Sequence, residues 1–336
     1  MQAQSHHRTP AAPHRARTRR GAFLAASATA VLALALAGCG SAASFSGHHH
    51  THTDGAAHGT ADPSAAAPSA GGHAGHDMAG HDAAGAGRAA AGNGLAAERG
   101  GYRLTATAGT AGTADTLPAG TPAEYRFTIT GPDGKPVTAF AVDQTKRMHF
   151  YAIRTDLTGF QHLHPEMATD GTWTAPLAAL APGSWRLYAS FTPDSGPGAG
   201  GGLVLSRTVT VAGEGAAASE VVPAATGTAT VDGYTVAVEG ALKAGSAGAL
   251  KVTVSRDGAP VTDLQPYLDT YAHLTAFHAG DQAFAHLHPQ GATTGGDGGP
   301  TLPFHAELPA AGDWRLFLQF QTGGTLHTAA LTLRVA

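Results

Sequence analysis

The sequence predicts an all-β protein in which two tandem β-sandwich domains follow a disordered, histidine-rich tether. Three observations support this fold class. Short segments with alternating apolar and polar residues recur along residues 101–336, and Gly- and Pro-containing turns separate them. None of these segments has a helical period of useful length. The second half of the chain also repeats the first, and a repeat longer than about 100 residues indicates a duplicated domain rather than a solenoid.

Residues 1–38 have the features of a lipoprotein signal peptide. Five arginines and no acidic residue precede an apolar run that ends in Leu36-Ala37-Gly38-Cys39. A basic start, a short apolar run and small residues before a cleavage point are typical of export, and the run is short for a transmembrane helix. The last four residues resemble the bacterial lipobox. We therefore expect a lipid on Cys39 that anchors the protein to the outer face of the cytoplasmic membrane.

That cysteine is the only one in the chain. If it is lipidated, the mature domains contain no thiol. A blue-copper site needs a cysteine ligand and a thiol enzyme needs a cysteine nucleophile, so both classes are excluded.

Residues 39–99 form the predicted tether. They are mostly Ala, Gly, His, Asp and Ser, with too little apolar surface to fold. Histidine-rich tracts bind divalent metals and copper, and methionine sulfur suits Cu(I). We expect either weak metal capture or a plain spacer; the weak ligands would be His48, His49, His50, His52, His73, His76, Met78 and His81.

The duplication divides the rest of the chain into a first domain over 100–213, a linker over 214–225 and a second domain over 226–336. The segment Gly183-Ser184-Trp185-Arg186-Leu187 corresponds to Gly312-Asp313-Trp314-Arg315-Leu316. An aromatic residue just after a Pro-Gly corner resembles the F strand of immunoglobulin-like domains. The sequence thus predicts immunoglobulin-like sandwiches of the usual size, with both tryptophans in the core.

A pattern of three histidines occurs in both domains: one histidine, and 13 residues later a His-Leu-His-Pro segment. Residues i and i+2 of a strand share a face, and the first histidine would lie on the antiparallel neighbour. Three imidazoles could then bind one ion, provided that the register does not slip by one residue. The predicted ligands are His149, His162 and His164, then His273, His286 and His288, with Asp269 as an oxygen ligand or an orienting group.

Imidazole ligands suit copper and zinc, and copper wins an open competition between divalent ions. We expect copper, with zinc as the alternative, in a protein that stores, delivers or detoxifies metal, and another metal-handling protein as its exchange partner. In the competing interpretation the histidines bind no metal and serve packing or contact with a protein partner, and the domains form an adhesion or protein-interaction module. We do not expect an enzyme, because Glu166 in one copy is replaced by Gln290 in the other. The net charge of -4 gives no reason to bind nucleic acid.

The duplicated histidine segments and Trp-Arg-Leu strands, behind a lipobox and a histidine-rich tether, resemble a group of uncharacterised actinobacterial secreted lipoproteins. The most typical stretch is Gln265-Pro266-Tyr267-Leu268 followed by Ala272-His273-Leu274. The resemblance covers residues 101–336 and implies immunoglobulin-like domains and copper handling. Ala141-Val142-Asp143-Gln144 departs from that stretch, so the resemblance favours the second domain as the typical site.

Overall fold

The computed structural model describes residues 92–213, 222–291, 293 and 296–336. The expected signal peptide, Cys39 and the tether histidines and methionine lie outside these residues. All described residues fall in one compact unit. Every regular element among them is a β-strand, as predicted. In the described part of the chain, no helix has the length and apolarity needed to cross a membrane.

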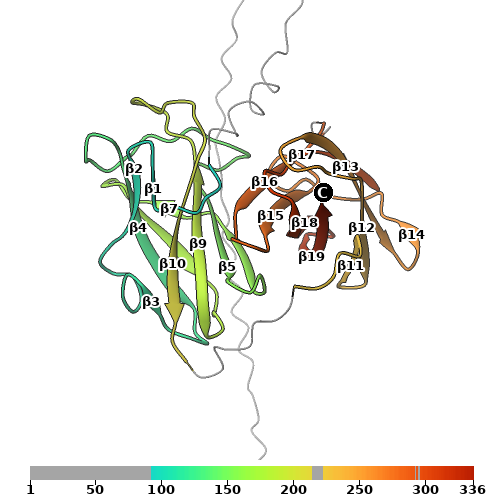
Figure 1. Ribbon diagram of the computed structural model, residues 1–336, viewed down its shortest axis with the longest axis horizontal. Helices are drawn as coiled ribbons and strands as arrows, with labels where there is room; N and C mark the ends of the chain where they lie inside the picture. The colour runs from blue at the N-terminus through green and yellow to red at the C-terminus, as the bar shows by residue number, and fades with distance from the viewer. Residues whose placement is uncertain (1–91, 214–221, 292, 294–295) are drawn as a thin grey trace, which may run out of the picture. The chain divides into compact units, whose positions relative to one another are not determined.

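The first repeat is a β-sandwich of two five-stranded sheets (Figure 1). One sheet has the order β1-β2-β4-β8-β7 and the other β3-β10-β9-β5-β6. This order matches the ABED and GFC sheets of an immunoglobulin domain, so the predicted fold class is confirmed. The strands are β1 (Glu98–Arg99), β2 (Tyr102–Ala106), β3 (Thr116–Leu117), β4 (Ala123–Thr130), β5 (His149–Arg154), β6 (Phe160–Leu163), β7 (Glu166–Met167), β8 (Thr172–Leu177), β9 (Gly183–Phe191) and β10 (Leu203–Val211).

The second repeat has the same plan, but its strands form one continuous sheet with the order β11-β12-β13-β17-β16-β15-β18-β19, and β14 pairs with β13. The two layers are joined because β16 pairs first with β15 and then, at its end, with β17. The strands are β11 (Thr228–Val231), β12 (Tyr234–Glu239), β13 (Ala247–Arg256), β14 (Ala259–Pro260), β15 (His273–His278), β16 (Phe284–Pro289), β17 (Thr301–Glu307), β18 (Gly312–Thr322) and β19 (Thr325–Val335).

Each sandwich encloses its own apolar core, and the predicted tryptophans lie in these cores. Trp185 is 2% exposed and Trp314 is fully buried. Each indole N–H donates to the carbonyl oxygen four residues earlier, at 2.9 Å in both repeats. The glycines that begin the two strands, Gly183 and Gly312, have φ angles of 134° and 127°, a conformation that favours glycine. The Gly-x-Trp corner is therefore a structural feature of the duplicated fold.

The first sandwich begins slightly earlier than the sequence predicted. Glu98–Arg99 already form β1, on the tether side of the predicted boundary at residue 100. Leu95 packs against buried residues, and the carbonyl oxygen of Asn93 accepts a hydrogen bond from the backbone N–H of Phe284. Both contacts are with the second repeat, so the end of the predicted tether already belongs to the folded part of the chain.

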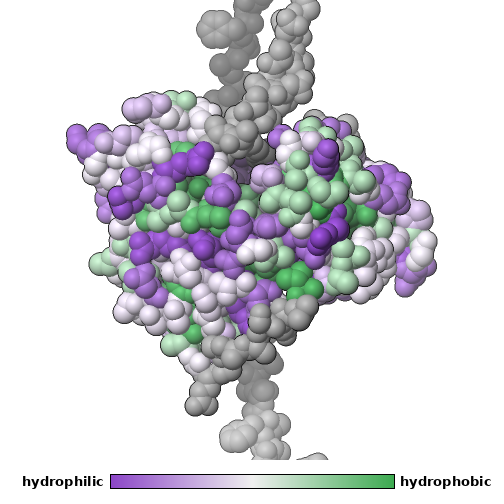
Figure 2. All heavy atoms as spheres, viewed as in Figure 1, coloured by the Kyte–Doolittle hydropathy of each residue, from purple (hydrophilic) through white to green (hydrophobic). Residues whose placement is uncertain are grey.

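A third apolar cluster joins the two repeats. It lies on the faces of β5, β9 and β10 and of β15, β16 and β18 that point away from the sandwich cores, and we call it the inter-repeat cluster. Phe160 of the first repeat and Phe317 of the second stack at 4.3 Å with an interplanar angle of 8°. On the molecular face shown in Figure 2, hydrophobic residues are interspersed with hydrophilic ones. The buried members of the cluster are Tyr151, Ile153, Leu157, Tyr188, Val204, Phe277, Phe284 and Phe317.

Candidate metal centre

The β5–β6 hairpin sets which side chains of the first repeat share a face. Its register pairs Phe150 with Leu163 and Tyr151 with His162. The same antiparallel register extended by one step puts His149 opposite His164. Side chains alternate along a strand, so His149, His162 and His164 project from one face. The register on which the sequence prediction depended is the one that brings the three imidazoles together.

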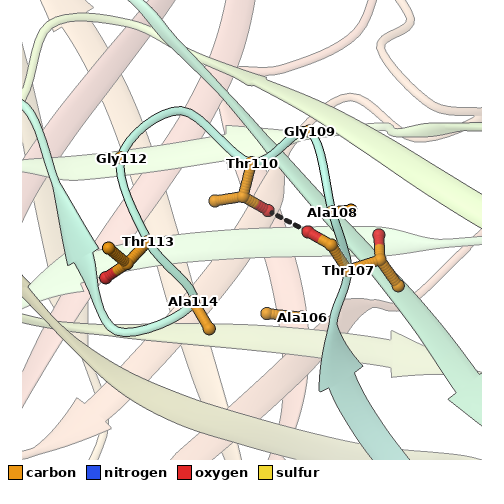
Figure 3. A pocket seen from close by; sticks show the side chains of 8 residues that line it. All are labelled: Ala106, Thr107, Ala108, Gly109, Thr110, Gly112, Thr113 and Ala114. Carbon is orange, nitrogen blue, oxygen red and sulfur yellow. Dashed lines mark hydrogen bonds between the residues drawn. The ribbon is translucent and has the colours of Figure 1, made fainter.

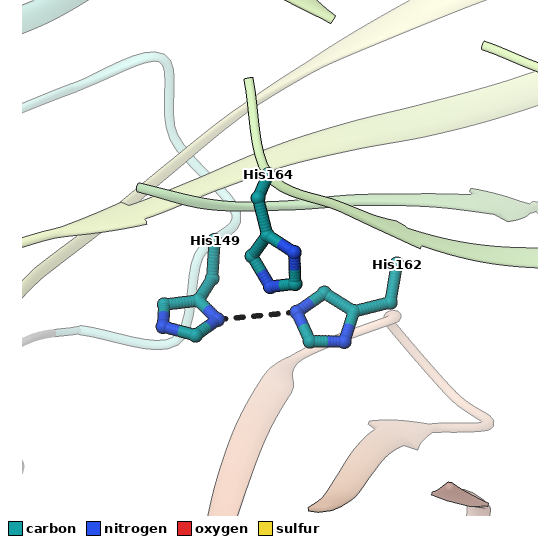
Figure 4. Close-up of side chains that lie close together, drawn as sticks. All are labelled: His149, His162 and His164. Carbon is teal, nitrogen blue, oxygen red and sulfur yellow. Dashed lines mark hydrogen bonds between the residues drawn. The ribbon is translucent and has the colours of Figure 1, made fainter. Parts of the chain in front are cut away.

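The three imidazoles form a group that could hold a metal ion, with one ligand atom from each within 4.8 Å of the others. Figure 4 shows the His164 ring directed between the other two. Nδ1 of His149 and Nε2 of His162 are 3.1 Å apart. Two nitrogens that bind a tetrahedral ion at 2.0–2.1 Å lie about 3.3 Å apart. The closest pair is thus already near the spacing that an ion requires.

Hydrogen bonds on the far side of two rings direct their lone pairs into the group. His149 donates from Nε2 to the backbone carbonyl oxygen of Asp143 at 3.0 Å, so its neutral form carries no proton on Nδ1. His162 donates from Nδ1 to Oε1 of Gln319 at 2.8 Å, which leaves a lone pair on Nε2. Two lone pairs facing each other at 3.1 Å repel unless a cation lies between them. Outer hydrogen bonds of this kind are characteristic of metal-bound histidines.

The surroundings keep two of the imidazoles neutral, which is the form that binds metal. Burial, then the neighbouring His149 and His164, hold the pKa of His162 well below its usual value. Burial, with smaller contributions from His149 and Lys146, lowers the pKa of His164 to about 3. Nε2 of His164 is buried and has no hydrogen-bond partner. A buried, neutral and unpartnered ring nitrogen is suited to accept an ion in place of a proton.

The second repeat brings together two of its three predicted ligands. Nδ1 of His273 and Nε2 of His286 are 3.4 Å apart, and His273 is fully buried. Nε2 of His273 also lies 3.3 Å from the hydroxyl of Tyr151 in the first repeat. The backbone of His288 pairs with His305 at the end of β16, but its side chain lies outside the described part of the structure.

Asp269 occupies a different setting from the histidines. It is exposed in the tight turn Tyr267–Thr270, where both Leu268 and Asp269 have positive φ angles. The corresponding turn of the first repeat, Asp143–Lys146, has the same two positive angles. The group that could hold an ion among the described residues contains histidines alone. The role of Asp269 as a ligand therefore stays a prediction.

Sequence reasoning missed two side chains and one backbone group that position the histidines. Tyr151 stacks on the ring of His162 with centroids 4.4 Å apart, and the hairpin pattern could have revealed it because it shares the histidine face. The carbonyl oxygen of Asp143 and the side chain of Gln319 orient two rings. Gln319 belongs to β18 of the other repeat, so no local sequence signal could have identified it.

Two further histidines of the second repeat have structural partners elsewhere. His278 contacts Oδ1 of Asp281 at 2.8 Å and packs against Trp314 with ring centroids 5.1 Å apart. His327 is 6% exposed and lies between Oδ2 of Asp232, at 2.8 Å, and the hydroxyl of Thr322, at 3.0 Å. These contacts account for both rings without a ligand, so the two residues serve as matched controls for the centre.

A surface pocket in the first repeat has different chemistry (Figure 3). It is lined by residues 106–110 and 112–114, all of them Ala, Thr or Gly, and Thr110 donates a hydrogen bond to the carbonyl oxygen of Thr107 at 3.0 Å. Its lining contains no charged or imidazole side chain. The loop therefore offers no imidazole or carboxylate ligand set.

Comparison with known proteins identifies the duplicated unit. The family described as a domain of unknown function (DUF8832) matches residues 101–198 and again residues 229–336. The two matches agree with the internal repeat seen in the sequence. A search of curated proteins finds no match.

Solved structures that resemble the chain include several immunoglobulin-like proteins. The Ig1-2 module of the Drosophila receptor protein tyrosine phosphatase DLAR is 8% identical, with coverage of 70% of this chain and 98% of the module and a TM-score of 0.20. A marsupial T cell receptor is 10% identical, with 70% and 96% coverage and a TM-score of 0.21. Salmonella alpha-2-macroglobulin reacted with methylamine is 11% identical with a TM-score of 0.24; 73% of this chain is covered, but only 15% of that protein.

Proposed function

The chain belongs to the DUF8832 domain family, and we propose that it binds a transition-metal ion, copper in the first place, at the His149–His162–His164 group. One observation carries this proposal. The lone pairs of His149 Nδ1 and His162 Nε2 face each other at 3.1 Å, while a carbonyl oxygen accepts the outer N–H of each ring. Outer hydrogen bonds of this kind support a metal site, because a cation between the two facing lone pairs removes their repulsion.

The choice of copper rests on ligand chemistry. Imidazole nitrogens bind both copper and zinc, and the Irving–Williams order favours Cu²⁺ over Zn²⁺ at such a site. The lipobox at Cys39 and the histidine tracts of the tether support a place outside the cytoplasm, where the tether would gather ions near the membrane surface. We therefore propose a lipid-anchored protein for copper storage, delivery or tolerance that passes metal to or from a partner protein, with zinc as the alternative ion.

Binding fits the centre better than catalysis. A hydrolytic metal site commonly pairs its ion with a general base, often a carboxylate, and the candidate group among the described residues consists of imidazoles only. The three side chains are buried or half-buried, which restricts the access of a substrate. A retained ion, exchanged with a partner protein, suits that environment.

Equilibrium dialysis with Cu²⁺ or Zn²⁺ tests the proposal. The full chain is used with asparagine at all eight histidines of the tether, so that bound metal reports the β-domains. These are His48, His49, His50, His52, His58, His73, His76 and His81. We expect retained copper, and loss of the ion held by the first repeat when His149→Gln and His162→Gln are combined. His278→Gln and His327→Gln are the matched controls and should keep the metal. Metal content at background in the parent chain would refute the site and favour the protein-interaction module.

A further inference from the structure

The second repeat reproduces the closest contact of the first with the same atoms. In the first repeat, Nδ1 of His149 lies 3.1 Å from Nε2 of His162. In the second, Nδ1 of His273 lies 3.4 Å from Nε2 of His286. Both separations are near the roughly 3.3 Å expected for two nitrogens on one tetrahedral ion. Each repeat thus contains its own pair of imidazoles at metal-binding spacing.

The two sets of histidines are neighbours. The His162 and His273 rings, from different repeats, have centroids 4.6 Å apart and an interplanar angle of 18°. The His149 ring lies 5.6 Å from that of His273 and 5.8 Å from that of His286. These separations between repeats are similar to the 5.4 Å between His149 and His162 inside the first repeat. The histidines therefore form one cluster.

Tyr151 links the two sets directly. Its ring stacks on His162 at 4.4 Å, and its hydroxyl lies 3.3 Å from Nε2 of His273. Gln319 makes a second link, because this residue pairs with His273 in the β15–β18 ladder and accepts a hydrogen bond from His162. Each repeat thus supplies a side chain that contacts a histidine of the other.

Apolar packing holds the two histidine hairpins together. The rings of Tyr188 and Phe284, from different repeats, are 5.5 Å apart, and the Tyr188 hydroxyl donates to the carbonyl oxygen of Gln282 at 2.6 Å. These residues belong to or adjoin the inter-repeat cluster, which is buried beside the histidines. Burial of several large aromatic side chains stabilises this contact and fixes the separation between the two hairpins.

We propose that the two repeats build one two-ion centre, in which His149, His162 and His164 bind the first ion and the His273–His286 pair binds a second ion next to it. This proposal rests on the proposed function and deepens it. The duplication would serve to double one site rather than to provide two remote ones. Repulsion between neighbouring cations makes the second ion bind more weakly than the first.

Electron paramagnetic resonance of bound Cu²⁺ tests the pairing, because the spins of neighbouring ions couple. The experiment uses the full chain with asparagine at the eight tether histidines, loaded with CuSO₄ and dialysed. We expect two copper ions per chain and a resonance intensity well below that of two isolated ions. In the variant with His273→Gln and His286→Gln, we expect one copper ion with full intensity and no coupling.

Controls separate the possible failures. The single variant His286→Gln alters a half-buried side chain and guards against misfolding of the double variant, and His327→Gln tests the loss of a buried histidine outside the centre. Two ions with the full intensity of isolated spins, or one ion in the parent chain, would overturn the pairing while the proposed function stands. Coupling that survives His273→Gln and His286→Gln would also overturn it, and a chain without copper would refute both proposals.

Discussion

Gln319→Leu is the substitution that best tests how the centre is built. Gln319 is 4% exposed, and its Oε1 accepts the Nδ1–H of His162 at 2.8 Å, while its amide nitrogen lies 3.5 Å from the Thr328 hydroxyl. Leucine fills a similar volume but cannot accept a hydrogen bond. The variant therefore removes the group that orients His162 and leaves the three proposed ligand histidines unchanged.

Two consequences follow for His162. Its buried Nδ1–H loses its acceptor, which costs about 1–3 kcal/mol if the ring keeps its tautomer. The ring can avoid this cost by moving the proton to Nε2 and donating to His149, and that proton then occupies the place of the ion. Loss of an outer hydrogen bond to a ligating histidine typically weakens metal binding 10–100-fold, or by about 1.4–2.8 kcal/mol.

Competition with a chelator of known copper affinity at pH 7.5 measures this effect in the chain that has asparagine at the tether histidines. Gln319→Glu restores an acceptor and should keep the affinity within about threefold of the parent chain or raise it, since a carboxylate partner makes the imidazole a better ligand. Gln321→Leu, in the same strand, is the matched control. The orientation argument fails if Gln319→Leu binds copper as tightly as the parent chain.

Four other predictions concern stability and are measured by urea unfolding. The lowered pKa values of His162 and His164 mean that protons bind preferentially to the unfolded chain below its ordinary histidine pKa of about 6.5. The free energy of unfolding of the metal-free protein should thus fall by up to about 2 kcal/mol between pH 6.5 and 5.5. The fall is smaller to the extent that solvent screens the half-buried His164. A free energy of unfolding that does not change over this pH range would contradict the prediction. Copper at 100 times its dissociation constant should raise the free energy of unfolding at pH 7 by about 2.7 kcal/mol, and no rise would argue against binding to the folded state. Phe317→Ala removes a ring stacked on Phe160 and should lower the free energy of unfolding by about 3–5 kcal/mol. Leu326→Ala, at an exposed position, should change it little. Gly159→Ala should lower the free energy of unfolding by more than about 1 kcal/mol, because φ of Gly159 is +61° and the new Cβ would lie 2.6 Å from Cη2 of Trp185. An unchanged free energy of unfolding would show that the loop relaxes.

Much of the fold could be predicted because the duplication repeats local signals. The alternating segments predict strands, and the Gly-x-Trp corner predicts a strand with its tryptophan in the core, as Trp185 and Trp314 confirm. The hairpin that presents His149, His162 and His164 on one face also follows from the two-residue period of a strand, once the register is right.

The meeting of the two histidine sets could not be predicted in the same way. It depends on packing between the outer faces of β5 and β15, and the sequence was interpreted one domain at a time. A signal was nevertheless present: Tyr151, Ile153 and Phe277 are large apolar residues on the face opposite the sandwich core. A strand that is apolar on both faces is buried on both faces. That pattern predicts a partner surface but does not identify it.

The measurement that tests the central claim most directly is anomalous diffraction from crystals of the protein grown with copper and recorded at the copper edge. If the site binds copper, a peak should lie about 2.0–2.1 Å from His149 Nδ1 and His162 Nε2, with His164 turned toward it. A centre without anomalous density, with the His149 and His162 nitrogens still in direct contact, would contradict it.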